Sequence, residues 1–178
     1  MNKLRTAKPV LSLFLYVGDE MAKNIKWKRL LPALMLPLAL GGLSAWLNRG
    51  AMADYAVLNK PPLSPPGWLF PVVWTLLFLL MGLAAYLVAV SPVSDRRRER
   101  ALSLYLVQLG FCFFWGSLFF GLGAWFAAFV WLLVLLGLAL VCCLLFWHIH
   151  RRAGALLLPY LLWLLFAAYL NLSLWLIN

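Results

Sequence analysis

Five apolar stretches, each about as long as a bilayer is thick, constrain the fold of this chain more than any other feature. A helix needs roughly 20 apolar residues to cross the hydrocarbon core, and unpaired backbone groups are so costly there that such runs must be helical. The chain is 66% hydrophobic and 11% charged, whereas about a quarter of a soluble domain is charged. The stretches span about residues 29–47, 68–90, 101–122, 124–147 and 155–177. We therefore predict an all-α integral membrane protein, in which one bundle of five transmembrane helices occupies residues 29–178.

The positive charges lie in alternate connections between these stretches. The formal net charge of +10 could indicate a nucleic-acid partner. However, thirteen of the basic residues precede the first, third and fifth stretches, and only Arg49 and Lys60 fall in the other connections. This is the positive-inside pattern, and it predicts a cytoplasmic N-terminus and an outer C-terminus, in what we expect to be a bacterial cell membrane. No concentrated basic face remains for nucleic acid, so anionic lipid is the acidic partner we retain.

Residues 1–28 are predicted to form a cytoplasmic extension outside the bundle. The apolar run Pro9–Val17 follows three basic residues, as in a signal peptide, but it is short and lacks a small-residue cleavage site. We expect the first twenty residues to be dispensable, with Met21 as an alternative start.

The apolar stretches lack the acidic and histidine side chains that usually carry out acid–base or metal chemistry. All five acidic residues and both histidines lie outside the apolar stretches, whereas proton-coupled carriers keep such groups inside the membrane. His148 and His150 are two residues apart and would face different ways on a helix. We interpret Cys112, Cys142 and Cys143 as apolar packing residues. The sequence thus predicts no metal site, no required cofactor and no catalytic set of side chains.

The chain contains ten tryptophans, which are its most distinctive candidate functional side chains. Six lie near the ends of the stretches, as is typical of the membrane interface. The other four lie inside four different stretches: Trp74, Trp115, Trp131 and Trp163. At 1.5 Å per residue, the first three would sit roughly 10 Å below the outer surface.

Polar and small residues share helical stripes with these tryptophans. Gln108 and Cys112 lie on the stripe of Trp115, and Ala167 and Asn171 lie on that of Trp163. The rings could simply face lipid or fill the core. Alternatively, they could wall an aromatic cavity in the outer half of the bundle, which would suit a flat, apolar ligand.

A proline-rich loop precedes the second stretch, within NKPPLSPPGWLFPVVW. Proline fixes its own φ and restricts the residue before it, so such a loop loses little entropy when it becomes ordered. We predict a long ordered loop, about residues 48–67, that acts as a preshaped lid over the cavity. Arg49 and Lys60 in this loop could meet a ligand carboxylate or lipid head groups.

Three sequence blocks carry a family resemblance: YAVLNKPPLSPPGWLFPVVWTLLF (55–78), QLGFCFFWGSLFFG (108–121) and PYLLWLLFAAYLNLSLWLIN (159–178). They are similar to the patterns W-Y-x-x-L-x-K-P-x-x-x-P-P-x-x-x-F-x-x-x-W, Q-L-x-L-N-x-x-W-S-x-x-F-F and P-Y-x-x-W-x-x-F-A-x-x-L-N. The chain therefore resembles the translocator protein family, whose patterns these are, also called the tryptophan-rich sensory proteins or, in animals, the peripheral benzodiazepine receptor. Each block alone is weak evidence, but the three in this order on five spans are specific.

The resemblance implies a five-helix bundle, often a homodimer, that binds protoporphyrin, haem, sterols and synthetic benzodiazepine-receptor ligands. By motif position, Tyr55 and Pro65 correspond to lid residues, and Trp74 and Trp163 to pocket tryptophans. Ala167 corresponds to a small residue whose enlargement disturbs ligand binding. The complete predicted ligand-binding set is Tyr55, Pro65, Trp74, Cys112, Trp115, Trp131, Trp163, Ala167 and Asn171.

The chain also departs from the family patterns. Asp54 replaces the usual tryptophan before Tyr55. Cys112 stands where asparagine is common, and Gly116 where serine is common, so two hydrogen-bonding groups are missing from the third helix. No basic residue follows Arg152, so the sterol motif near the C-terminus of mammalian members is absent.

These observations lead to three functional hypotheses. The favoured one is a membrane receptor or sensor that binds tetrapyrroles, with or without carrying them across the bilayer. The second is a light-dependent porphyrin-degrading enzyme that uses Trp74 and Trp163 as electron or radical partners. The third is a small-molecule exporter, which the lack of an intramembrane acid disfavours if the export is coupled to protons.

Overall fold

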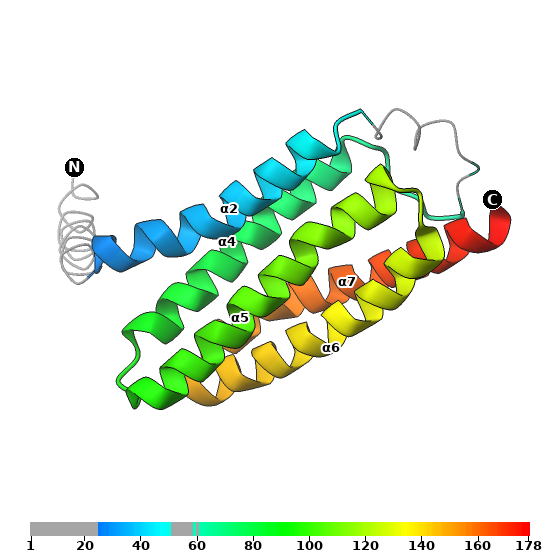
Figure 1. The fold of residues 1–178 in the computed structure, drawn as a ribbon. Coiled ribbons are helices and arrows are strands. Elements are labelled where there is room, and N and C mark those ends of the chain that lie inside the picture. Colours follow the sequence, from blue (N-terminus) through cyan, green and yellow to red (C-terminus); the bar gives the residue numbers. More distant parts are fainter. Residues whose placement is uncertain (1–24, 51–58, 60) are drawn as a thin grey trace, which may run out of the picture.

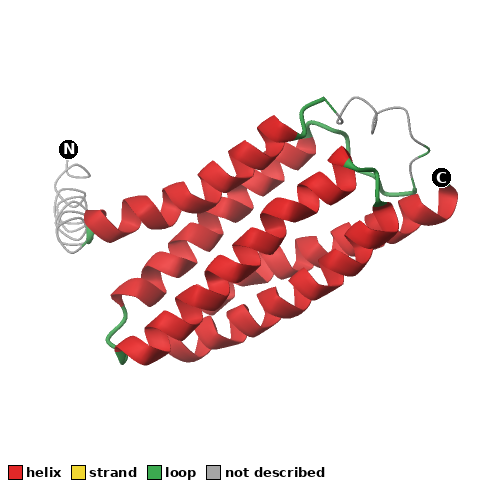
Figure 2. Cartoon of the chain, in the orientation of Figure 1, coloured by secondary structure: helices red, strands yellow, loops and turns green. Residues whose placement is uncertain are grey.

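The structure, a computed structural model, describes residues 25–50, 59 and 61–178. Five of its helices are long and apolar enough to cross a membrane, and the described residues contain no strand. In chain order the elements are α2 (Trp27–Leu47), α4 (Leu69–Val90), α5 (Asp95–Gly116), the short π-helix η1 (Ser117–Gly121), α6 (Trp125–Ile149) and α7 (Arg151–Ile177). The predicted all-α membrane bundle is therefore confirmed (Figures 1 and 2).

Several helices extend beyond the apolar stretches from which they were predicted. α5 begins at Asp95 instead of residue 101, and α7 begins at Arg151 instead of residue 155. Apolar composition marks only the part of a helix that lies in hydrocarbon, and both helices continue into a basic segment. Asp95 lies in the first turn of α5, where a negative charge is favoured by the helix dipole, and Arg98 pairs with it.

The N-terminal extension and the lid are only partly described. α2 begins at Trp27, so the last two residues of the predicted 1–28 extension belong to a helix of the bundle. Residues 1–24, 51–58 and 60 lie outside the described residues, and so does Tyr55.

The five long helices run side by side along the length of the molecule (Figure 1). α6 and α7 are joined by His150 alone and make the most extensive contact in the bundle, while α5 packs on α6 and α4 packs on α7. α2 lies at the edge and packs mainly on α4, with a smaller contact to α5. Consequently α2 is the least buried of the spans.

Glycines permit the closest helix contacts, as expected in a membrane, where helices associate through close packing. A Cβ atom on Gly82 of α4 would lie 2.6 Å from the carbonyl oxygen of Ala33 on α2. A Cβ atom on Gly154 of α7 would lie 2.8 Å from the Cα atom of Trp147 on α6. Because these two positions carry no side chain, α2 can approach α4, and α7 can approach α6, to within backbone contact.

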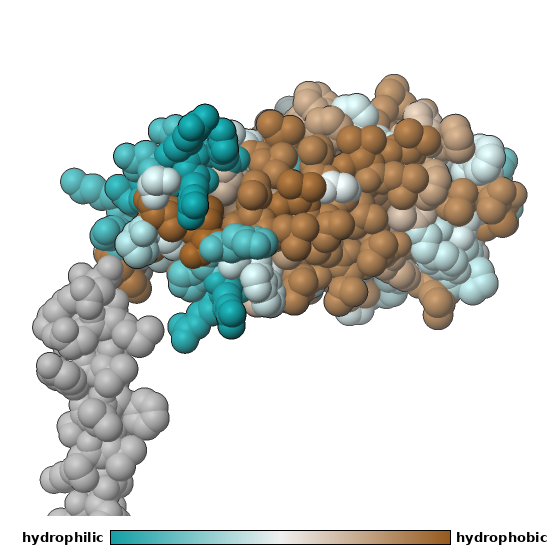
Figure 3. Space-filling view, turned by 90° about the horizontal axis from the view of Figure 1, so that it is seen from below, coloured by the Kyte–Doolittle hydropathy of each residue, from teal (hydrophilic) through white to brown (hydrophobic). Residues whose placement is uncertain are grey.

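The two ends of the bundle differ in chemistry. At one end, which we call the basic end, hydrophilic side chains gather beside an apolar band that covers the middle of the molecule (Figure 3). Arg98 donates hydrogen bonds there to the carbonyl oxygens of Ser91 and Val93, and Arg29 donates one to that of Ala89. These arginines satisfy carbonyl groups at and just beyond the end of α4, which would otherwise lack helical partners.

At the opposite end, which we call the loop end, the described part of the proline-rich loop is fastened to α7. The Asn59 amide donates to Oδ1 of Asn178 at 3.2 Å, and Nδ2 of Asn178 donates to the Asn59 carbonyl at 3.0 Å. The Tyr169 hydroxyl donates to the Pro62 carbonyl at 2.9 Å. The turn between α5 and α6 is also at this end, and Gly123 takes there a φ of 57°, which glycine adopts without strain.

Candidate functional site: an aromatic cavity between three helices

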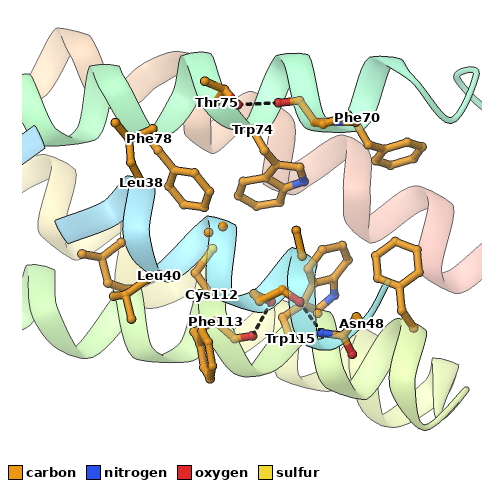
Figure 4. Close-up of a pocket in the computed structure, with 18 of the residues that line it drawn as sticks. Leu38, Leu40, Asn48, Phe70, Trp74, Thr75, Phe78, Cys112, Phe113 and Trp115 are labelled. Atoms are coloured by element: carbon orange, nitrogen blue, oxygen red, sulfur yellow. Dashed lines mark hydrogen bonds between the residues drawn. The ribbon is translucent and has the colours of Figure 1, made fainter. Parts of the chain in front are cut away.

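A cavity of about 440 Å³ lies between α2, α4 and α5, in the half of the bundle nearest the loop end. Close-packed interiors contain few voids larger than a water molecule, so a hollow of this size is a candidate binding site. Its walls combine aromatic rings of α4 and α5 with small residues of α2 (Figure 4).

Trp74 of α4 is the centre of the aromatic wall. Its ring stacks on that of Phe78 at a centroid distance of 5.4 Å, and it lies 5.9 Å from the ring of Trp115 on α5. Trp115 in turn stacks on Phe119 at 5.3 Å. Aromatic pairs at such distances contribute about 0.5–1.5 kcal/mol beyond the area they bury. The rings therefore hold one another in position and present a preformed surface to the cavity.

A second layer of rings lies behind Trp74, on α7. Trp74 meets Tyr160 and Trp163 edge to face, both at a centroid distance of 6.4 Å. The hydroxyl of Tyr160 donates a buried hydrogen bond to Oε1 of Gln108 on α5, at 2.9 Å. This contact between α5 and α7 fixes the layer on which Trp74 rests.

The polar groups of the cavity are few, and most are already paired. Oγ of Ser44 donates to the Phe113 carbonyl at 3.2 Å, and Nδ2 of Asn48 donates to the Ser44 carbonyl at 2.8 Å. The Nε1 of Trp115 differs, because it is buried and has no hydrogen-bond partner among the described residues. The Cys112 side chain points from α5 toward Trp74 and Phe78 (Figure 4). The site thus offers mainly apolar contact, with the thiol of Cys112 beside the rings.

Three residues of the predicted ligand-binding set line the cavity: Trp74, Cys112 and Trp115. Trp163 does not line it and instead contacts Trp74 from behind. Pro65 belongs to the loop, partly buried and outside the lining.

Trp131 lies away from the other three tryptophans. Its Nε1 donates to the carbonyl oxygen of Phe111 at 2.8 Å, and its ring stacks on that of Phe111 at 4.4 Å. Trp131 thereby fastens α6 to α5 on a face that does not line the cavity. Of the four interior tryptophans, Trp74 and Trp115 line this cavity, whereas Trp131 and Trp163 do not. That Trp131 and Trp163 affect a ligand stays a prediction.

Ala167 and Asn171 are both buried on α7 and do not line the cavity. Nδ2 of Asn171 donates to the Ala167 carbonyl at 2.7 Å, whereas its Oδ1 is buried without a partner among the described residues. That these two residues affect a ligand stays a prediction.

The contribution of α2 to the cavity was missed by reasoning from the tryptophans. Leu38, Gly41, Ser44, Ala45 and Asn48 lie on one side of this helix and all line the cavity. The spacing of Ser44 and Asn48, which places both on one helical face, could have indicated that this face of α2 packs against another helix. Polar side chains on an otherwise apolar span need hydrogen-bond partners there.

The described residues contain no group of three or more His, Cys, Asp or Glu side chains that could hold a metal ion. Together, the five spanning helices and the aromatic cavity define a small helical membrane protein with an internal hollow in one half of its bundle.

Comparison with known proteins agrees with this class. The chain matches the TspO/MBR family over residues 33–176 and belongs to that family. It is 34% identical to the tryptophan-rich protein TspO of Archaeoglobus fulgidus over 151 residues, which cover 84% of this chain and 97% of that protein. It is 38% identical to the translocator protein of Ovis aries over 68% of this chain and 72% of the relative. It is also 38% identical to the tryptophan-rich sensory protein of Cereibacter sphaeroides, over 66% of this chain and 72% of the relative.

Proposed function

We propose that this protein is a membrane receptor or sensor that binds tetrapyrroles, such as protoporphyrin or haem, and related flat apolar ligands. The observation that carries the proposal is the cavity of about 440 Å³ whose wall is formed by Trp74, Trp115 and Phe78. This volume lies within the range of about 300–1,000 Å³ that is usual for small-molecule sites.

The chemistry of the walls matches that of a planar ring system. Indole and phenyl faces stack on flat conjugated ligands, and the rings of Trp74, Phe78 and Trp115 line the cavity. Arg49, at the loop end next to Asn48 of the lining, lies over the ring of Trp46 at 4.9 Å. Its guanidinium group supplies a positive charge that would favour a ligand carboxylate.

The names of the relatives support a role in sensing or translocation. One relative is called a sensory protein and another a translocator protein. We infer that ligand occupancy is the primary event and that passage across the membrane is a further step. The homodimer and the sterol or lipid partners implied by the resemblance stay predictions.

Porphyrin absorbance tests the proposal directly. Purified protein in detergent is titrated with protoporphyrin, and binding is followed by the shift of the porphyrin absorbance band. Trp74→Ala and Trp115→Ala should each weaken affinity about tenfold or more, which corresponds to about 1.4 kcal/mol. Trp175→Ala is the matched control, because Trp175 is 45% exposed and lines no part of the cavity. Equal affinity in all four proteins would contradict the proposal.

A second candidate function is the light-dependent degradation of bound porphyrin by dioxygen. It is favoured by the contact between Trp74 and Trp163, since adjacent indoles can pass an electron from one to the other. Irradiation of the complex in air distinguishes the two functions. Bleaching that stops in Trp74→Phe or Trp163→Phe, while binding persists, supports degradation, and stable absorbance supports a receptor.

A further inference from the structure

We propose that the cavity opens sideways into the bilayer, between α2 and the loop-end half of α4, and that its ligand is exchanged with the lipid phase through this opening. The inference rests on the proposed function for the identity of the ligand, but the opening itself rests on independent observations.

The first observation is the uneven burial of the cavity wall. The residues of its deep side, such as Leu109, Cys112 and Trp115, are all buried. On the opposite side, five residues are exposed although they line the same cavity: Gly42, Ala45, Gly67, Pro71 and Thr75. Since a residue that both lines a cavity and faces the outside marks its mouth, the mouth lies where these residues meet.

The second observation is the path of α2. Toward the basic end α2 lies tightly on α4, because a Cβ atom on Gly82 would touch the backbone of Ala33 and Leu34. Toward the loop end its polar contacts go to the other neighbour. Ser44 donates to a carbonyl of α5, and Asn48 lies 3.5 Å from Oγ of Ser117. Beyond Gly41, whose added Cβ atom would still meet the ring of Phe78 on α4, α2 therefore turns toward α5, and Pro71 and Thr75 of α4 are exposed.

Helical geometry places the exposed residues at this gap. Successive residues on an α-helix are about 100° apart, so Ala45 lies about a quarter turn around α2 from Ser44, which donates to α5, and Ala45 is exposed whereas Ser44 is partly buried. Gly42 lies on the same exposed side as Ala45. Both residues are small, so this rim of the opening carries no bulky side chain.

The rim is also apolar, which suits passage through hydrocarbon. Oγ1 of Thr75 donates to the Pro71 carbonyl of its own helix at 2.7 Å, so its hydroxyl group is already paired. The described loop residues Asn59 and Pro62 do not line the cavity. They hydrogen-bond to Asn178 and to Tyr169 of α7 instead. The ligand class that fits this arrangement is a molecule that dissolves in lipid before it binds.

Exchange kinetics test the opening. Protein in vesicles is mixed with vesicles that carry protoporphyrin, and association and dissociation rates are measured. Ala45→Phe, which narrows the mouth from α2, should slow both association and dissociation about fivefold, because an obstructed path affects entry and exit alike. Thr75→Phe should act in the same way from α4. A change in the dissociation rate alone would instead indicate a contact with the bound ligand. Ala39→Phe is the matched control, since Ala39 is exposed on the same helix but does not line the cavity.

The native thiol of Cys112 gives a second test that needs no porphyrin. In thiol–maleimide addition, sulfur bonds to one alkene carbon and its proton passes to the other. A lipid-soluble maleimide should modify Cys112 at least about tenfold faster than a permanently charged maleimide, after each rate is normalised to that of free cysteine. Ala45→Phe should slow this modification and Ala39→Phe should not. Digestion with chymotrypsin is needed for mapping, because no Lys or Arg separates Cys112 from Cys142.

The outcomes separate the two proposals. If protoporphyrin does not bind but Ala45→Phe slows modification of Cys112, the opening stands and the proposed ligand is wrong. If protoporphyrin binds and Ala45→Phe matches Ala39→Phe in both experiments, the lateral opening is overturned. Equal normalised rates for the two maleimides would overturn it as well.

Discussion

The α6–α7 side of the bundle and the α2 side are built differently, although both consist of apolar membrane-spanning helices. Large side chains such as Leu132, Phe146 and Leu164 are completely buried where α6 and α7 contribute to the core. On α2, by contrast, Pro37 is the only buried residue. The tightly packed side supports the aromatic wall from behind, while the loosely packed side leaves room beside it. If the proposed function holds, stability and ligand binding depend largely on different helices.

The largest expected effect comes from enlarging a glycine on the packed side. Gly154→Val should lower the free energy of unfolding by about 3 kcal/mol, since the new side chain meets the backbone of Trp147 and overpacking is costly. Gly42→Val is the matched variant on the α2 side, because nothing lies within 4 Å of its added Cβ atom. Thermal unfolding in detergent should show a clear loss for Gly154→Val and almost none for Gly42→Val. Equal losses in the two variants would show that the α2 side is packed as tightly as the α6–α7 side.

A smaller effect is expected from the buried hydrogen bond between α5 and α7. Gln108→Leu leaves the hydroxyl of Tyr160 buried without its acceptor and should cost about 1–2 kcal/mol. The double variant Gln108→Leu, Tyr160→Phe removes both partners and should recover part of that loss. Chemical unfolding of the wild type, Gln108→Leu, Tyr160→Phe and the double variant measures the coupling energy between the two side chains. Strictly additive losses would show that the hydrogen bond contributes nothing to stability.

Ala167→Leu tests whether α7 influences the ligand through the ring layer. Ala167 is buried one turn from Trp163, so a larger side chain should displace α7 and, with it, the contact between Trp163 and Trp74. We expect protoporphyrin affinity to fall about fivefold, or about 1 kcal/mol, while membrane insertion is unchanged. Unaltered affinity would confine the site to α2, α4 and α5.

The smallest expected effects distinguish the partly buried Trp131 from the buried Trp115 by function. Trp131→Phe removes the hydrogen bond to the Phe111 carbonyl and should cost about 1 kcal/mol of stability, with no change in ligand affinity. Trp115→Phe removes part of a ring that lines the cavity, so it should weaken ligand affinity. It breaks no hydrogen bond among the described residues, so its stability loss comes only from lost ring contacts. If Trp131→Phe weakens binding more than Trp115→Phe does, the assignment of these rings is wrong.

The fold could be predicted from the sequence because the five long apolar stretches admit few alternatives to helices. The sequence also predicted that interior tryptophans of different helices would meet, and Trp74 and Trp115 do so. The rotation of each helix could not be predicted, because α6 is apolar on all sides and gives no signal for the direction of Trp131. The place of α2 depended on tertiary contacts between small residues and facing backbone, which hydrophobic patterning does not report.

The measurement that tests the central claim most directly is the protection of Cys112 by bound ligand. Cys112 lines the proposed site, whereas Cys142 and Cys143 are buried on α6 away from it. Saturating protoporphyrin should reduce the rate at which a lipid-soluble maleimide modifies Cys112 by about tenfold or more, since an occupied cavity excludes the reagent. An unchanged rate at Cys112, measured while porphyrin absorbance shows the ligand to be bound, would place the ligand elsewhere and contradict the account.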